Sequence, residues 1–447
     1  MAYGLQLRRN NSSRPYNGVM KTSTLANRLS RLFPPARTAG ASEVALIAAA
    51  FVLYSWYWPV SEHIVHLIIF FLVLSLWIER KSTLSRQLSF ILPAAFFFLF
   101  LAWLFLSVMW SGAFHQSLSY ALLVVLTGAT AVMLGMIVGL ERVLKGIVGG
   151  VLFLQFHGIV SPDGDNQWEG DYLWGLFSNP SELSVLLGIG LLATVFLFRS
   201  KIVANLLTGA IVAYLGWSLW TIQILTGTVS VVVALLVLIP VLHVRRVQHK
   251  FRLPLIGGYL FAGIAAIALF WFNRGPLLAL VGEDSTMSLR TVIWAYYWEA
   301  VMWRPVIGPG WGNSYGWNPI ERDRLQQVSE FFPAHNGFID TALMLGLVGL
   351  GLLVATLVAL FFAGISRVVA GEFPLRHSFI PVLVVYLSLN DMMATSLPKF
   401  IGIFLLGLMS GLLLRDPTGD AAGRNMLLVD LAKVGVEHQQ GTALTEK

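Results

Sequence analysis

Long apolar runs recur from about residue 42 to residue 415 and are separated by short polar stretches. A run of about 18 apolar residues can cross a bilayer as a helix, whose backbone groups are all bonded internally. We therefore predict twelve membrane spans, and we expect polar cytoplasmic tails at 1–41, which we predict to be disordered, and at 416–447. The spans are about 42–59, 62–79, 88–110, 118–139, 142–160, 180–198, 201–220, 223–243, 254–272, 336–363, 378–396 and 399–415.

Composition agrees with this pattern. The 447 residues are 56% hydrophobic and 12% charged, whereas soluble domains carry about 25% charged residues. The predicted class is thus an all-α polytopic membrane protein with one embedded domain, 42–415. Cysteine is absent, which excludes a disulfide framework and cysteine metal sites.

The net charge of +7 could reflect nucleic acid, anionic lipid or membrane topology. With a cytoplasmic N-terminus, 24 of the 30 Lys and Arg residues fall in cytoplasmic segments. Such a bias is the positive-inside pattern. Topology therefore accounts for the charge, and we predict no nucleic-acid partner.

The external loop 273–335 is the main polar segment between spans. It holds five of the six basic residues predicted to lie outside, and the sixth is Lys399. Because topology disfavours external cations, those present need another explanation. We expect Arg322 and Arg324 to be solvated, and we take Arg274, Arg290 and Arg304 as candidate ligand-binding residues.

A helix is predicted within this loop from about Ser288 to Trp303, before Pro305. Arg290, Trp294, Tyr297, Val301 and Arg304 would share one of its faces. The helix could lie along the membrane surface or lean back over the bundle. Paired guanidinium groups suit a diphosphate, with aromatic rings for sugar or isoprenoid. An amphipathic helix whose arginines reach lipid phosphates is the alternative.

Two further features belong to the end of this loop. Gly310 lies in a glycine-rich turn where backbone can approach a ligand or a neighbour closely. His335 and Asn336 stand at the mouth of the tenth span. His335 is either an interfacial, hydrogen-bonded histidine or a functional one that accepts a hydroxyl proton or contacts phosphate.

Acidic residues give weaker candidates. Asp163-Gly164-Asp165, with Asp171 nearby, could hold a metal, but an external position favours contact with an acceptor sugar, and we predict no metal. Asp391, near the outer end of the eleventh span, is either an interfacial residue or a substrate-binding one.

The ordered set of these motifs resembles the O-antigen ligase and O-antigen polymerase superfamily, including exopolysaccharide polymerases of the rhizobial type. The resemblance covers roughly residues 90–415 and rests on five segments. They are Leu106-Ser107-Val108-Met109-Trp110-Ser111, Gly175-Leu176-Phe177-Ser178-Asn179-Pro180, Ser288-x-Arg290-x-x-x-Trp294, Arg304-Pro305-x-x-Gly308-x-Gly310-x-Gly312, and His335-Asn336-Gly337-Phe338-Ile339-Asp340 leading into Gly346-Leu347-Val348-Gly349-Leu350.

The resemblance implies an inverting glycosyltransferase of the bacterial inner membrane, with its active site on the external face. The donor would be a glycan on undecaprenyl diphosphate and the acceptor a saccharide or lipid-linked saccharide. Other polysaccharide-assembly proteins are possible partners, alongside membrane lipid. No metal or cofactor is implied. The catalytic residues carried over are Arg290, His335 and Arg304, while Arg274, Trp294, Tyr297, Asn336, Gly310, Asp391 and Asp171 are expected to bind substrate.

One position departs from the family pattern. Many relatives place an arginine near the outer start of the eighth span, where this chain reads Thr226-Gly227-Thr228-Val229-Ser230. Arg274 and Arg304 are the two candidates to replace it. A transporter or flippase is the alternative class, although the chain has no internal repeat of the kind common in transporters.

Overall fold

A computed structural model describes residues 37–55, 62–80, 88–160, 180–198, 202–222, 224–273, 275–276, 290–312, 334–369, 375–393 and 399–415. All contacts discussed below lie within Ser42–Asp416. Every regular element in these segments is helical. They are α2 Arg37–Ser55, α3 Glu62–Arg80, α4 Leu88–Ser107, η1 Val108–Trp110, α5 Phe114–Ile137, α6 Leu140–Val160, α7 Pro180–Val195, α8 Ile202–Thr221, α9 Leu225–Leu236, α10 Leu238–Arg246, α11 His249–Phe272, α13 Arg290–Val301, α15 Gly337–Val369, η3 Leu375–Ser378, α16 Phe379–Asp391 and α17 Phe400–Leu414.

Each predicted span coincides with one of these helices or, for 223–243, with the pair α9 and α10. Among the described residues, five helical stretches are long and apolar enough to cross a bilayer, and five shorter helices are also apolar. The five long ones are Ile91–Trp110, Phe114–Ile137, Leu225–Val244, Lys250–Phe270 and Gly337–Val369. The chain is a polytopic membrane protein, and the number twelve stays a prediction.

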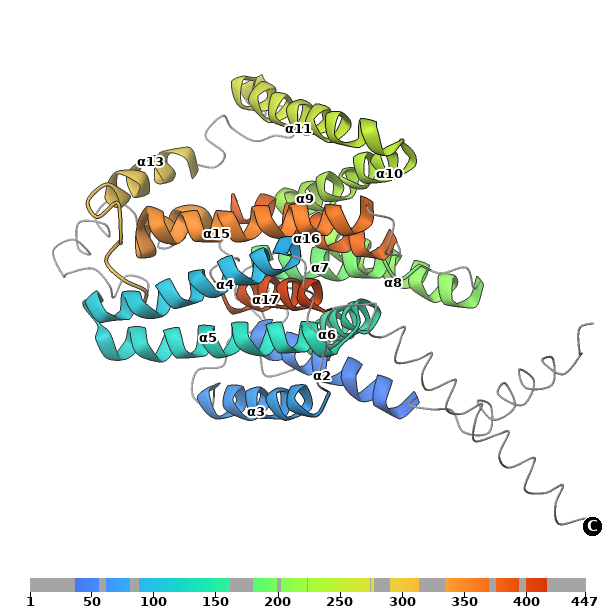
Figure 1. Ribbon diagram of the computed structural model, residues 1–447, viewed down its shortest axis with the longest axis horizontal. Helices are drawn as coiled ribbons and strands as arrows, with labels where there is room; N and C mark the ends of the chain where they lie inside the picture. The colour runs from blue at the N-terminus through green and yellow to red at the C-terminus, as the bar shows by residue number, and fades with distance from the viewer. Residues whose placement is uncertain are drawn as a thin grey trace, which may run out of the picture. The chain divides into compact units, whose positions relative to one another are not determined.

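Helix α17 forms the centre of the packed helices and contacts α5, α4 and α15 (Figure 1). Every residue from Gly402 to Leu414 is buried. Its backbone comes close to α5, because Gly407 lies beside the carbonyl of Gly128 and Gly411 beside Gly135. Small residues at such crossings let membrane helices pack closely. The close packing of α17 therefore fixes the position of its first residues, next to Lys399.

Contacts among helix ends divide into two groups. Arg367 donates to the carbonyls of Leu412 (2.9 Å) and Arg415 (3.1 Å), and Arg252 donates to that of Val369 (2.7 Å). These basic residues gather at helix ends that we predict to be cytoplasmic. The starts of α7, α15 and α17 and the end of α16 form the second group, which holds the candidate site.

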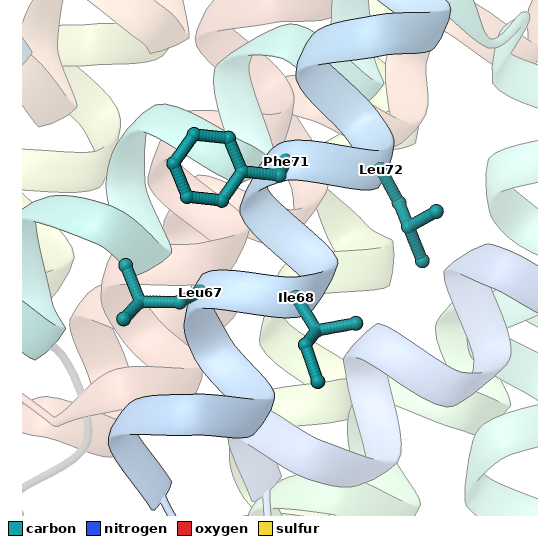
Figure 2. Close-up of a pocket in the computed structure, with 4 residues that line it drawn as sticks. All are labelled: Leu67, Ile68, Phe71 and Leu72. Atoms are coloured by element: carbon teal, nitrogen blue, oxygen red, sulfur yellow. The ribbon is translucent and has the colours of Figure 1, made fainter.

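Figure 2 shows a hollow of about 420 Å³ on α3, lined by Leu67, Ile68, Phe71 and Leu72. All four side chains are apolar and belong to one helix. Sugars and phosphates require polar groups for binding. We therefore assign this hollow to the lipid-facing surface.

Candidate functional site

The start of α15 is fixed by its own side chains. The Asn336 Oδ1 atom accepts hydrogen bonds from the backbone N–H groups of Phe338 and Ile339, both at 3.1 Å. This is the arrangement of an N-cap. The Asn336 amide also donates to the carbonyl of Met392 at 3.1 Å, which ties α15 to the end of α16. Asn336 thus holds the adjacent His335 in a defined place.

His335 itself has a left-handed backbone, with φ of 51°. Side-chain-bearing residues adopt this region rarely, although histidine does so more often than most. The preceding residue is anchored, because the Ala334 N–H donates to the Asp340 carboxylate at 3.0 Å. Hydrogen bonds on both sides therefore keep this strained residue, and its half-buried imidazole, in position.

Asp391 lies against the same helix start. Its side chain is fully buried, and a Cβ on Gly337 would overlap its carboxylate. Only glycine at 337 lets the two helix ends approach so closely. The structure thus brings Asp391, Asn336 and His335 together from two helices.

The loop helix α13 lies on α15 rather than apart from it. The Trp294 Nε1–H donates to the carbonyl of Ala334 at 3.2 Å, one residue before His335. Tyr297 and Val301 are each 1% exposed and pack with Ala334 and Leu343. Of the two placements open from the sequence, the one in which the helix leans back over the bundle is confirmed.

The segment after α13 is attached to a break in α15. At Gly346 the helix is interrupted, with φ of 67° and ψ of −174°. The N–H groups of Leu347 and Val348 donate to the carbonyls of Pro305 (2.7 Å) and Val306 (3.2 Å). Backbone groups freed by the break are thereby bonded, as they must be within a membrane.

Carbonyl groups before the break are also bonded. The backbone N–H of Gly310 donates to the carbonyl of Met344 (3.0 Å), and the Trp103 indole N–H donates to the carbonyl of Leu345 (3.0 Å). The next residue of the loop, Trp311, donates through its backbone to the Ser107 hydroxyl at 2.9 Å. Together these bonds fix the turn that follows Arg304 against α15 and α4.

The electrostatic surroundings of His335 are cationic. Burial lowers the pKa of its imidazole below the ordinary 6.5, and the positive charges of Arg290 and Lys399 lower it further. The ring is therefore neutral at pH 7 and can accept a proton. Stability arising from this difference is present above pH 6.5 and is lost as the pH falls through the folded-state pKa.

Lys399 forms an ion pair with Glu182, which joins the start of α17 to the start of α7. α7 is in turn attached to α16, because the Tyr386 hydroxyl donates to the carbonyl of Val185 at 2.9 Å. The sequence pattern assigned Lys399 no role beyond that of an external cation. The signal that could have identified Lys399 was its predicted external position, which topology disfavours.

Residues 214–354, which include Arg290, the Arg304 turn, His335 and the break at Gly346, match the family model described as O-Antigen ligase. This segment belongs to the O-antigen ligase family. The chain is also 24% identical over 310 residues to the exopolysaccharide production protein ExoQ of Rhizobium meliloti (strain 1021). That alignment covers 66% of this chain and 70% of the relative.

The predicted site residues fall into three groups. Arg290, Trp294, His335 and Asn336 lie in the O-antigen ligase segment and meet at the start of α15, where Asp391 joins them from outside the segment. Arg304, Tyr297 and Gly310 also lie in the segment. Tyr297 is a buried packing residue, Gly310 uses its N–H to hold Met344, and Arg304 begins the attached turn.

Arg274 and Asp171, together with Ser288, Asp163, Asp165, Arg322 and Arg324, lie outside the described residues. The described part of the predicted loop helix is Arg290–Val301, and it ends two residues before the predicted end at Trp303. Its exposed residues include Val292, Tyr296 and Trp298, together with one acidic residue, Glu299. The exposed side is thus largely apolar and aromatic, which fits a position next to lipid.

Proposed function

We propose that the chain is an integral-membrane glycosyltransferase. It transfers a glycan from undecaprenyl diphosphate to a saccharide acceptor during synthesis of a surface polysaccharide, as an O-antigen-type ligase or a polymerase. One observation carries the proposal: a neutral, half-buried His335 stands beside the cationic Arg290 in the O-antigen ligase segment. A base and an anion-binding cation side by side suit displacement of a diphosphate.

The proposed reaction is a single displacement. The acceptor hydroxyl oxygen forms a bond to the anomeric carbon while the bond from that carbon to the diphosphate breaks, so the configuration inverts. His335 takes the hydroxyl proton, and undecaprenyl diphosphate leaves with the bonding electron pair. Arg290 and Arg304 stabilise the charge that develops on the diphosphate. Trp294, Asn336 and Asp391 hold the start of α15 and so position His335. The activated donor supplies the driving force without metal or nucleotide.

Purified protein in liposomes tests this proposal. With an undecaprenyl-diphosphate-linked oligosaccharide and a saccharide acceptor, and no nucleotide, we expect a transferred or lengthened glycan. Arg290→Ala should lower the rate by about 100-fold or more, as expected for loss of one oxyanion-stabilising group. Arg246→Ala, an exposed arginine at the opposite group of helix ends, is the matched control and should retain activity.

Movement of the lipid-linked glycan across the bilayer without any new glycosidic bond would instead assign the chain to the transporters. Full transfer activity in Arg290→Ala would overturn the assignment of the site.

A further inference from the structure

We propose that Lys399 is a further donor-binding residue, whose ammonium group contacts the diphosphate together with Arg290 and is positioned for this by Glu182. This inference rests on the proposed function. Neither residue lies in the segment that matches the O-antigen ligase family, 214–354.

Lys399 occupies a position that neither helix stability nor topology favours. It is the N-cap residue of α17, and its side chain makes no capping hydrogen bond. Helix N-termini favour negative charge, and the positive-inside pattern disfavours external lysine. The same terminus, with its free N–H groups, attracts anions. A lysine here adds a full charge to a place already suited to phosphate.

The ion pair with Glu182 does not explain Lys399 through stability. The side chains are 45% and 40% exposed, and exposed pairs of this kind contribute little. Its geometric effect is larger, because it holds a flexible four-carbon side chain between the starts of two buried helices. Exposure also leaves the ammonium group accessible to a ligand.

Lys399 and Arg290 act on the same group from different helices. Both charges reach the His335 imidazole, and each lowers its pKa. Three acidic residues lie on the helices that meet here. Asp340 holds Ala334, Asp391 lies against Gly337, and Glu182 pairs with Lys399. Two cations near one imidazole match the two phosphates of a donor whose reacting carbon lies near the base.

The neighbourhood of Lys399 also includes the start of α9. Gly227 lies against Ser184 of α7, two residues beyond Glu182. Thr226, where this chain lacks the basic residue expected from the family resemblance, precedes Gly227. Lys399 therefore joins Arg274 and Arg304 as a candidate to supply that charge, and it reaches the region from α17.

Binding of undecaprenyl diphosphate, the released product, tests the proposal without any reaction. The melting temperature of detergent-solubilised protein should rise when this lipid binds the folded state. We expect Lys399→Gln to need about 10-fold more lipid for the same rise, as one lost charge-assisted contact implies, and Lys399→Arg to behave like the wild type. Lys250→Gln, an exposed lysine among the predicted cytoplasmic ends, should not differ from the wild type.

Kinetics provide a second, independent readout. Lys399→Gln should raise the KM for the donor and move the acidic limb of the pH profile upward, because one charge that lowers the pKa of His335 is removed. Glu182→Gln should raise the KM more modestly. Unchanged lipid binding and pH profile in Lys399→Gln overturn the proposal, and so does an equal loss in Lys399→Arg, which would mark a structural role. If the wild-type protein itself transfers no glycan, that result contradicts the proposed function rather than the role of Lys399.

Discussion

His335 combines a strained backbone with a side chain whose pKa is lowered by burial and by two nearby cations. A non-glycine residue in the left-handed region costs on the order of 1–3 kcal/mol, and such residues concentrate at functional sites. Here the Asn336 cap and the hydrogen bond from Ala334 to Asp340 offset this free-energy cost. Helix packing does not require a histidine at this point. The proposed role does, because the base must remain neutral beside the cations proposed to bind phosphate.

The pH dependence of transfer follows from this environment. Because burial, Arg290 and Lys399 lower the pKa of His335, the acidic limb of kcat/KM should lie below pH 6.5. Added salt should move that limb upward, since it screens the two charges. A pH series at low and high ionic strength measures both effects. An acidic limb above pH 6.5 that salt leaves in place would contradict the account.

At the scale of elements, the break in α15 and the helix α13 together shape the site. The break provides unpaired backbone groups to which the turn after Arg304 is bonded, and α13 rests on the half of α15 that leads to His335. A continuous α15 would leave Pro305 and Val306 without their partners. The position of Arg304 thus depends on a conformation of Gly346.

Gly346→Ala tests the break. The φ and ψ of Gly346 lie in a region essentially restricted to glycine, and a Cβ would overlap the Val306 carbonyl. We expect a loss of stability of at least about 1–3 kcal/mol, seen as a lower melting temperature, together with reduced transfer. Gly351→Ala is the control on the same helix, since a Cβ there meets nothing within 4 Å. Equal melting temperatures would exclude a structural role for the break.

Tyr297 and its neighbour Tyr296 test the seating of α13. Tyr297 is 1% exposed and Tyr296 is 48% exposed. Truncation of a buried aromatic residue costs about 3–5 kcal/mol, so Tyr297→Ala should release α13 and increase proteolysis of the loop. Tyr296→Ala should change stability by less than about 0.5 kcal/mol. Similar cleavage of both variants would show that α13 is not seated on α15.

At the scale of the whole molecule, the site lies where helix ends that we predict to be external meet. The cysteine-free chain makes this topology easy to test. Gln116→Cys, at the start of α5, and Gln248→Cys, before α11, are both exposed. A membrane-impermeant thiol reagent should label the first in intact cells and the second only after lysis. The reverse pattern would invert the orientation and place the site on the cytoplasmic side.

Sequence patterns predicted the helices and the loop helix, because hydrophobic runs are local signals, whereas Arg290 and His335 were selected together from the family resemblance. The break at Gly346 was not predicted, since it lies inside an apolar run whose hydropathy does not change. The pair of Lys399 and Glu182, which are 217 positions apart, depends on the packing of α7 and α17. No spacing along the chain encodes that contact.

Single-turnover transfer by His335→Gly tests the central claim most directly. Glycine accepts the left-handed backbone without strain, so this variant should fold at least as stably as the wild type. With donor labelled in both lipid and glycan, the wild type should release one undecaprenyl diphosphate for each glycan transferred. His335→Gly should do so about 100-fold or more slowly, as for loss of a general base. Wild-type transfer rates in the folded variant would contradict the account.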